Sequence, residues 1–423
     1  MNNDFNCNFR VDSGQVKYRP AGKEDIPALL KLSRLAEANG SAPLNDSFAG
    51  PRPFEALAKK DGSPAPHNPQ KILEEMQSEN SILFAAEKGK DLVAVIFVLS
   101  ERNHGLCKIY RMYADAGAEG AREILKKLLL FAMDHLQNSA FRPDVLYTTT
   151  RTLTLKQQEF TLDLGFKLLG IFPNVPGQAP SGFNGLTARY FNNALADKRY
   201  TDFSLHPAIA PFYEITRKEC GLGKLPVSPP AAPAEDRNRT TLPVLEALQA
   251  PGFVARRFDM LKERKFLSIN FYPFQKPNIL ITSPDQGIEM FVKAVQEPRF
   301  AAIVAEKLDV AVDPVQLYKA VALILRGLNI SYIEVINDAA DAAGINDILN
   351  AGYLPCAYFP ALKRQGNARR DFVIFSKSFE RIFQPFSGDV NETYKQYLKA
   401  YLSLSAKHSG GSPPIQPGGH SAV

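Results

Sequence analysis

The sequence predicts a mixed α/β protein, with α+β character, built from two similar domains. Three observations lead to this prediction: strands of antiparallel type open the first well-patterned region, strand–helix–strand crossovers close it, and the same series of elements recurs about 190 residues later. Each domain is expected to hold a mixed, mostly antiparallel twisted sheet flanked by helices.

The first region begins with a short strand over 16–22 and a helix over 23–38, whose apolar residues have helical spacing. The segment 40–68 is rich in Pro, Gly, Asp and Asn and predicts a long loop. The remaining elements follow in chain order: a helix over 69–77, strands over 81–87, 92–100 and 106–115, a helix over 121–136, a strand over 145–150, a helix over 154–164, and strands over 166–172 and 186–191.

The second region repeats this order, with strands over 266–272, 279–281, 288–294 and 301–306, a helix over 314–328, a strand over 332–336, a helix over 339–351, and strands over 356–359 and 372–376. Between the regions, 221–252 has the proline clusters of an extended linker, with one short helix near 242–248. The predicted domains are 1–195, a helical and Pro-rich linker 196–255, a second domain 256–382, and a C-terminal helix with a disordered tail from 405 within 383–423.

Composition narrows the class of protein. Hydrophobic residues make up 45% of the 423 residues and charged residues 22%, so a core can form. The net charge of +6 comes without a basic run that interleaves aromatics, which argues against nucleic acid as a partner. The four cysteines and six histidines are dispersed, so no metal site is expected. The longest apolar stretch, 92–99, is too short to cross a membrane, and we expect a cytoplasmic protein.

The most informative stretch is IYRMYADAGAEGAREILKKLL, residues 109–129. A strand runs into a loop of small residues and a long helix starts at once. Because small residues let a ligand approach the backbone, and free N–H groups begin the helix, this turn can bind an anionic phosphate. An ordinary tight turn between strand and helix is the other interpretation.

The order of elements over 16–195 resembles the GNAT superfamily of acyl-CoA-dependent N-acyltransferases. The opening VKYRPAGKEDIPALLKLSR resembles the first strand and helix of that family, and LDLGFKLLGIF resembles its closing motif. The resemblance implies that the loop amides hold the pyrophosphate of the cofactor. Gly120 keeps the central glycine of the family motif, whereas Gly117 stands where Arg or Gln is usual and Arg122 replaces a small residue.

The resemblance also places Met112 where the family offers a backbone N–H to the thioester carbonyl, a donor that stabilises an oxyanion. The implied cofactor-binding residues are Met112, Ala114, Gly117, Ala118, Glu119, Gly120, Ala121 and Arg122. The cofactor, used as a co-substrate, is then acetyl-CoA or another acyl-CoA, with no metal.

A direct attack by an amine needs a base for the amine proton and an acid for the leaving thiolate. Where the family often has a tyrosine and an asparagine on the short helix, this chain has Thr161 and Thr154. The remaining catalytic candidates are Glu101 as base and Tyr113 and Tyr147 on neighbouring strands. Two nearby residues are read differently, His104 as a solvated turn residue and Cys107 as a small core residue.

The later run ILNAGYLPCAYFPALKRQGNARRDFVIFSKSFE resembles the end of a GNAT domain, with Gly352 and Tyr353 in the Gly-Phe place. Pro314, at the first helical position, has no N–H to donate, so a phosphate cradle is not expected there. We interpret this half as a degenerate copy. Arg369, Arg370 and Asp371 are interpreted as a cluster at a strand end on the surface.

The resulting hypothesis is an N-acyltransferase that moves an acetyl or other acyl group to a primary amine of a small molecule or peptide. The alternative is a catalytically inactive GNAT-like module that binds acyl-CoA as a sensor, or that acts as a scaffold. The chain is expected to be a monomer or homodimer. Fold alone does not decide between these functions.

Overall fold

A computed structural model describes residues 16–38, 80–115, 117–151, 155–173, 183–229, 241–296, 299–380 and 390–408. The loop expected over 40–68, the helix expected over 69–77, and two single positions of interest, Ala116 and Thr154, lie outside the described residues. Within the described residues, no helix has both the length and the apolar character needed to cross a membrane.

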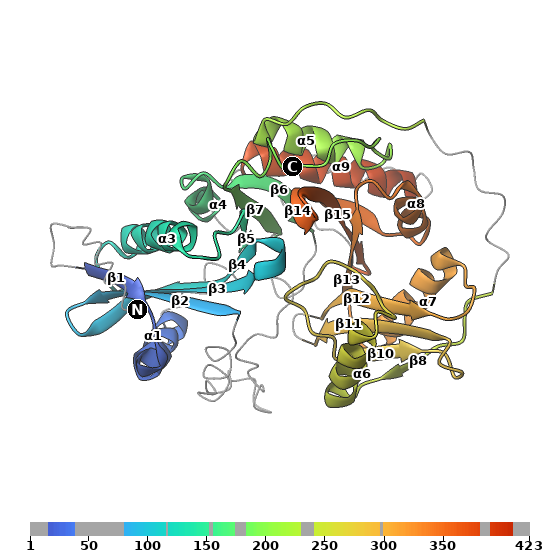
Figure 1. The fold of residues 1–423 in the computed structure, drawn as a ribbon, viewed down its shortest axis with the longest axis horizontal. Coiled ribbons are helices and arrows are strands. Elements are labelled where there is room, and N and C mark those ends of the chain that lie inside the picture. Colours follow the sequence, from blue (N-terminus) through green and yellow to red (C-terminus); the bar gives the residue numbers. More distant parts are fainter. Residues whose placement is uncertain are drawn as a thin grey trace, which may run out of the picture.

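The first half of the chain forms strands and helices in the order that the sequence predicts (Figure 1). Its elements are β1 (Val16–Pro20), α1 (Ile26–Ala38), β2 (Ser81–Lys88), β3 (Asp91–Glu101), β4 (Leu106–Ala114), α3 (Ala121–Asn138), β5 (Val145–Arg151), α4 (Leu155–Leu162), β6 (Lys167–Phe172) and β7 (Asn184–Tyr190). A further helix, α5 (Ala210–Cys220), follows within the predicted linker.

The second half repeats the series with β8 (Glu246–Leu248), α6 (Pro251–Glu263), β9 (Ser268–Ile269), β10 (Ile279–Thr282), β11 (Ile288–Val295), β12 (Phe300–Leu308), α7 (Pro314–Gly327), β13 (Tyr332–Asp338), α8 (Ala342–Asn350), β14 (Leu354–Gln365), β15 (Ala368–Ser378) and α9 (Glu392–His408). The prediction of a helix near 242–248 is wrong: this segment contributes β8, which pairs with β10 at the sheet edge. The strand expected over 266–272 is limited to β9, and α9 extends beyond residue 405, where the tail was expected to begin.

All these strands belong to one mixed, largely antiparallel sheet. Read inward from its two edges, the strand order is β1-β2-β3-β4-β5-β7-β6 on one side and β8-β10-β11-β12-β13-β15-β14 on the other. Each half has one parallel pair, β4–β5 and β12–β13. Each also has a β-bulge at the same place, after Phe97 and after Phe291. The same order of elements therefore occurs twice, with the same pairing.

The two halves meet where β6 pairs with β14 through Gly170 and Ala357. A Cβ atom at Gly170 would lie 2.2 Å from the Cβ of Ala357, so the contact requires glycine. Helices α5 and α9 lie side by side over this seam (Figure 1), joined by a 2.7 Å hydrogen bond between the hydroxyls of Thr216 and Tyr397. The halves thus share one sheet and the helix pair α5 and α9 that packs on it at the seam.

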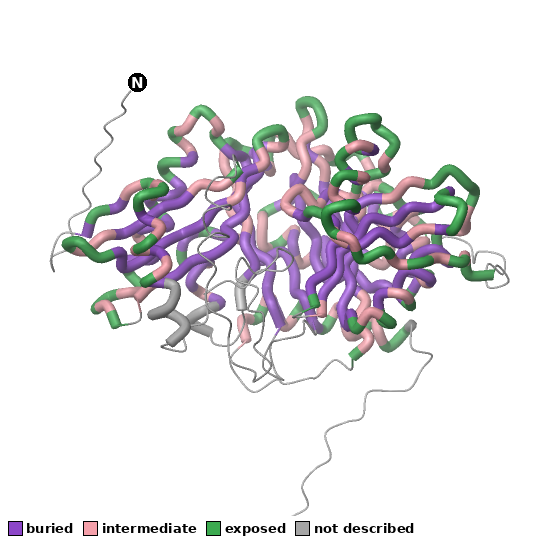
Figure 2. The backbone as a smooth tube through the Cα atoms, turned by 90° about the horizontal axis from the view of Figure 1, so that it is seen from below, coloured by how far each residue is buried: buried purple, intermediate pink, exposed green. Residues whose placement is uncertain are grey.

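Helices cover both faces of the sheet, and buried residues run continuously through the strands between them (Figure 2). In the first half α3 packs Ile124, Leu125 and Leu128 on one face, while α1 packs Leu29 and Leu32 on the other. In the second half α7 and α6 take the corresponding places. The helical spacing of apolar residues in the sequence therefore reports the buried sides of these helices correctly.

Buried ion pairs connect the halves at the seam. The Arg369 guanidinium, 0% exposed, lies 2.9 Å from the Asp144 carboxylate, and Arg199 pairs with Asp371 at 2.6 Å. The interpretation of 369–371 as a surface cluster is therefore wrong for two of its three residues. Only Arg370 is partly exposed, and it pairs with Asp338.

His104 is also placed differently from the expectation of a solvated turn residue. Its Nδ1 lies 3.0 Å from the carbonyl oxygen of Arg364 in the second half, and its ring meets Phe271 edge-on. Partial burial lowers the pKa of the His104 imidazole. Cys107, by contrast, is fully buried in the core as expected, and burial raises the pKa of its thiol.

Candidate active site

The parallel strands β4 and β5 stay paired over only three residues. Their register runs from Leu106 opposite Val145 to Lys108 opposite Tyr147, and beyond this point the strands separate. The Thr148 hydroxyl spans the start of the opening and donates to the carbonyl oxygen of Ile109 at 3.2 Å. The result is a gap in the sheet between the second part of β4 and the second part of β5.

Main-chain groups of β4 point into this gap. The amide of Asp115 donates to the carbonyl of Val93 on β3 at 2.8 Å. Since successive amides of a strand point to alternate sides, the amide of Tyr113 also faces β3, and the amides of Met112 and Ala114 face the gap. Met112 therefore has the orientation that its predicted role requires.

The loop after β4 satisfies part of its own hydrogen-bonding capacity. The Gly117 amide donates to the Asp115 carboxylate at 2.9 Å, and the Ala118 amide donates to the Asp115 carbonyl at 3.0 Å. The Ala121 amide in turn donates to the carbonyl of Ala118 at 3.1 Å. These three amides, counted among the cofactor-binding candidates, already have acceptors because the turn folds back on itself.

The rest of the loop is open. Within the described part of the chain, the amides of Glu119, Gly120 and Arg122 have no acceptor. Gly120 has φ 72°, in the left-handed region, and a Cβ atom added there would meet nothing within 4 Å. These amides begin α3 and face open space, which is the geometry that binds anions at helix N-termini.

The Arg122 side chain is directed toward α4. Its guanidinium lies 4.0 Å from the carboxylate of Asp163 and 5.9 Å from the centre of the Phe160 ring. Lys126, one turn later on α3, shares the same carboxylate at 3.3 Å. Both partners of the Arg122 pair are about half exposed, so the pair is weak and leaves the guanidinium free to exchange partners.

The structure does not bring Glu101 to the gap. It is paired with Leu106 at the opposite end of the β3–β4 hairpin, whereas Met112 is opposite Ile96. Five residues of strand separate the two positions, or about 17 Å. The Glu101 carboxylate instead caps the following turn by accepting from the amide of Asn103.

Tyr113 and Thr161 are both in the core. The Tyr113 hydroxyl accepts a 2.6 Å hydrogen bond from Arg111, and its ring meets Phe97 edge-on beneath α1. Thr161 is 0% exposed. Tyr113 thus lies on the α1 face of the sheet, away from the start of α3, and Thr161 is buried within the fold.

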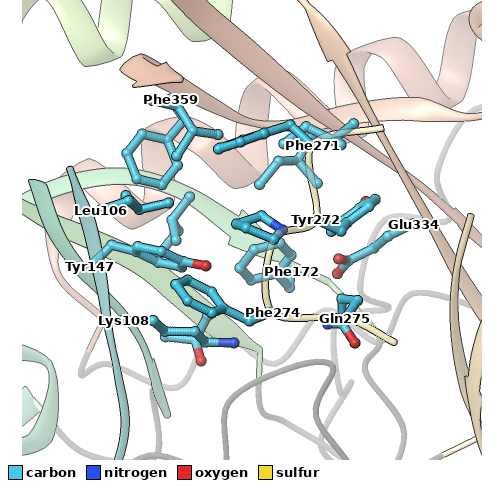
Figure 3. A pocket seen from close by; sticks show the side chains of 16 residues that line it. Leu106, Lys108, Tyr147, Phe172, Phe271, Tyr272, Phe274, Gln275, Glu334 and Phe359 are labelled. Carbon is cyan, nitrogen blue, oxygen red and sulfur yellow. The ribbon is translucent and has the colours of Figure 1, made fainter. Parts of the chain in front are cut away.

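Tyr147, one of the catalytic candidates, lines a pocket (Figure 3). This central pocket lies between the two halves and has a cavity volume of about 60 Å³. Aromatic side chains form much of its wall, among them Phe172, Phe271, Phe274 and Phe359. Burial raises the pKa of the Tyr147 hydroxyl, and the nearby Glu334 raises it further, so this phenol keeps its proton at neutral pH.

Two charged residues that the sequence analysis did not select also line the central pocket. Lys108 enters from β4, and burial lowers the pKa of its amine to about 8. Glu334 enters from β13 and is 3% exposed, and burial raises the pKa of its carboxyl well above the ordinary value. A charged residue inside a strand of otherwise apolar residues, as in YIEVIND, is the sequence signal that could have identified Glu334.

The corresponding helix start in the second half is closed. Pro314 occupies the first helical position of α7, and the Asp313 carboxylate accepts from the amide of Val315 at 2.9 Å. The proline has no N–H, and the carboxylate already fills the place of an anion. That no phosphate cradle lies there stays a prediction. Among the described residues, no group of His, Cys, Asp and Glu is arranged to hold a metal ion.

No protein-family model matches the sequence, and no curated protein matches it. Solved structures to which the chain is similar include an N-acetyltransferase from Staphylococcus aureus, with 14% identity, coverage of 42% of this chain and 98% of that chain, and a TM-score of 0.32. A ribosomal-protein-alanine N-acetyltransferase from Brucella melitensis has 16% identity, coverage of 41% and 99%, and a TM-score of 0.29.

A third neighbour is a candidate acetyltransferase from Salmonella typhimurium, solved with its cofactor acetyl-CoA. It has 12% identity, coverage of 42% of this chain and 95% of its own, and a TM-score of 0.31. Because the TM-scores are this low, we infer the function of this chain from its own geometry.

Proposed function

We propose that this protein is an N-acyltransferase that uses acyl-CoA, most simply acetyl-CoA, and acts on a primary amine. The observation that carries the proposal is the gap between β4 and β5. The amides of Met112 and Ala114 point into it, and the open N-terminus of α3 stands at its end. An amide in this position can orient a thioester carbonyl and stabilise charge on its oxygen.

The residues at the end of the gap can bind the anionic part of acyl-CoA, but with fewer main-chain donors than the resemblance implies. The amides of Glu119, Gly120 and Arg122 would hold its diphosphate, and the open space around Gly120 leaves room for it. The Gly117 amide is excluded, because Asp115 already accepts from it. When bound, the thioester supplies an activated acyl group.

Two proton transfers are then needed: an acid protonates the leaving thiolate, and a base takes the proton of the amine. Tyr147 adjoins the closed end of the gap and keeps a proton that it can donate. It cannot act as base at neutral pH, because burial raises the pKa of its hydroxyl. Glu101 and Tyr113 lie outside the gap, so the base must come from another element.

Calorimetric titration with acetyl-CoA tests the cofactor site. Wild type should bind with a dissociation constant of about 1 μM to 1 mM. The variant Gly120→Glu should lose binding, because its carboxylate would face the diphosphate. Gly221→Glu is the matched control: Gly221 also has a left-handed φ, 66°, with nothing within 4 Å, but it ends α5. Equal affinity in wild type and Gly120→Glu would remove the loop from the site.

A second function, acyl-CoA binding without catalysis, is favoured because the predicted catalytic side chains Glu101 and Tyr113 lie outside the gap. Asp115 also caps part of the loop. Release of free thiol from acetyl-CoA, measured with polyamines, amino acids and aminoglycosides, separates the two functions. Release with any amine supports the transferase, whereas binding without release supports a sensor or scaffold.

A further inference from the structure

The central pocket contains polar atoms that the fold leaves without partners. The Oε1 atoms of Glu334 and Gln275 and the hydroxyl of Tyr272 are buried and have no hydrogen-bond partner among the residues that the structure describes. Glu334 is 3% exposed and Gln275 is 8% exposed. A buried acceptor without a donor destabilises a folded protein by about 1–3 kcal/mol, so the combination of two indicates a ligand that supplies donors.

The pocket also defines the kind of ligand. Two of its unpartnered atoms are acceptor oxygens, one of them on a carboxyl group, so a nitrogen with several N–H donors is complementary to them. Its wall is largely aromatic and aliphatic, which suits an apolar body. In Figure 3 the Glu334 carboxyl and the Tyr147 hydroxyl enter the pocket from opposite sides.

We propose that the central pocket binds a primary amine on an apolar arm, with its nitrogen donating to the Glu334 carboxyl and the Gln275 amide oxygen. The role of this amine as the acceptor of acyl transfer depends on the proposed function. Its binding to the pocket does not, and can be measured without acyl-CoA.

The location of the pocket connects the amine to the gap. Leu106 and Lys108 line the pocket, and they form the first and the last of the three pairs between β4 and β5 before the strands separate. The pocket therefore adjoins the closed end of the gap. An amine held there stands beside the strand that presents the Met112 amide.

Glu334 also supplies the base that the first half lacks. Burial raises the pKa of its carboxyl, and the nearby Lys108 lowers it, so that in its ionised form the carboxylate is a stronger base toward a bound ammonium than an ordinary carboxylate is. In that step an N–H bond of the ammonium breaks, an O–H bond forms on Glu334, and the nitrogen keeps the electron pair. The second half thus contributes to a reaction whose cofactor loop lies in the first.

The experiment is a calorimetric titration of the full chain with phenethylamine, and with phenethyl alcohol as its neutral counterpart, in the absence of CoA. Wild type should bind the amine at least about tenfold more tightly than the alcohol. Glu334→Gln, which keeps the shape of the side chain, should weaken amine binding by about tenfold or more and leave alcohol binding unchanged. Glu306→Gln is the control, because it removes a partly buried carboxyl of the same half that does not line the pocket.

Equal binding of amine and alcohol by wild type, or equal amine binding by wild type and Glu334→Gln, would overturn the proposal. If Glu334→Gln fails to fold, Gln275→Leu serves as the second variant, and unchanged amine binding in it has the same meaning. Amine binding with no acetyl-CoA binding would reject the transferase but retain the pocket. Acetyl-CoA binding with no amine binding would reject the amine pocket but retain the proposed cofactor site.

Discussion

The two halves of the chain have the same strand order and the same bulge, yet they differ where α3 and α7 begin. In the first half, α3 starts at Gly120 with open space around it. In the second half, Pro314 and the carboxylate of Asp313 close the start of α7. Two halves with one topology can therefore have similar cores while only one of them has an open helix start. Topology alone does not show where a cofactor can bind.

A second difference lies in the central pocket. The parallel pair β4–β5 places Lys108 opposite Tyr147, and the matching pair β12–β13 places Ala302 opposite Glu334. Tyr147 and Glu334 thus occupy equivalent positions in the two halves, and both side chains line the same pocket. The halves supply different chemistry from the same position, so each completes what the other lacks.

The largest effect is expected where the halves are joined. Arg369→Met leaves the buried carboxylate of Asp144 without one of its cations and should lower the free energy of unfolding by about 3–5 kcal/mol. Arg370→Met, at the neighbouring and partly exposed residue, should cost about 1 kcal/mol or less. Urea unfolding followed by tyrosine fluorescence measures both. Similar losses in the two variants would show that the seam does not depend on the buried pair.

Glu334→Gln should stabilise the protein at neutral pH by about 0.5–2 kcal/mol, because a buried group kept for binding costs stability. The carboxyl has an ordinary pKa of 4.5 in the unfolded chain and a raised pKa in the folded one, where Lys108, Tyr147 and Tyr272 surround it. The folded wild type therefore loses stability as the pH rises above 4.5, and the variant does not. Thermal unfolding at several pH values should show a difference that grows with pH; a constant difference contradicts this account.

Asp313→Ala should lower the free energy of unfolding by about 1 kcal/mol, because it removes the cap from the amide of Val315. The second half has Pro314 in addition, so this variant should not create a second binding site for acetyl-CoA. A calorimetric titration that gains a second equivalent of acetyl-CoA would show that the cap alone distinguishes the two helix starts.

The smallest effect is expected at Asp115, whose carboxylate lies beside the proposed diphosphate site. Asp115→Asn keeps an acceptor for the Gly117 amide and removes the negative charge. Acetyl-CoA should then bind about two- to fivefold more tightly at low salt, and the gain should fade at high salt. Weaker binding would indicate that the negative charge of Asp115 is needed for the loop conformation.

Much of the fold could be predicted from the sequence because each element carries its own periodicity. The apolar spacing in 121–136 identifies α3, and the residues at that spacing are buried, together with Phe131 and Met133. Errors occur where a partner decides the conformation: β8 is a strand because β10 pairs with it, although its residues form helices readily. The linker 196–255 was predicted to be partly helical, but no bounds were predicted for α5, which packing on the seam stabilises.

The site could be predicted less well. Small residues in the loop indicate that a ligand can approach, but they do not show that the Asp115 carboxylate and main chain already accept from its amides. The position of Met112 followed from the resemblance, and the alternation along β4 agrees with it. Glu334 and Gln275 were not identified, because their meeting with Tyr147 depends on how two halves of one chain face each other.

The strand pairing at Gly170 and Ala357 has a consequence for any attempt to study one half by itself. Removing either half would expose the last strand of the other, β6 or β14, along an unprotected row of main-chain donors and acceptors. Such a fragment is expected to aggregate or to pair with whatever strand it meets. Co-expression of both fragments from separate messages is therefore the practical route to dissecting this protein.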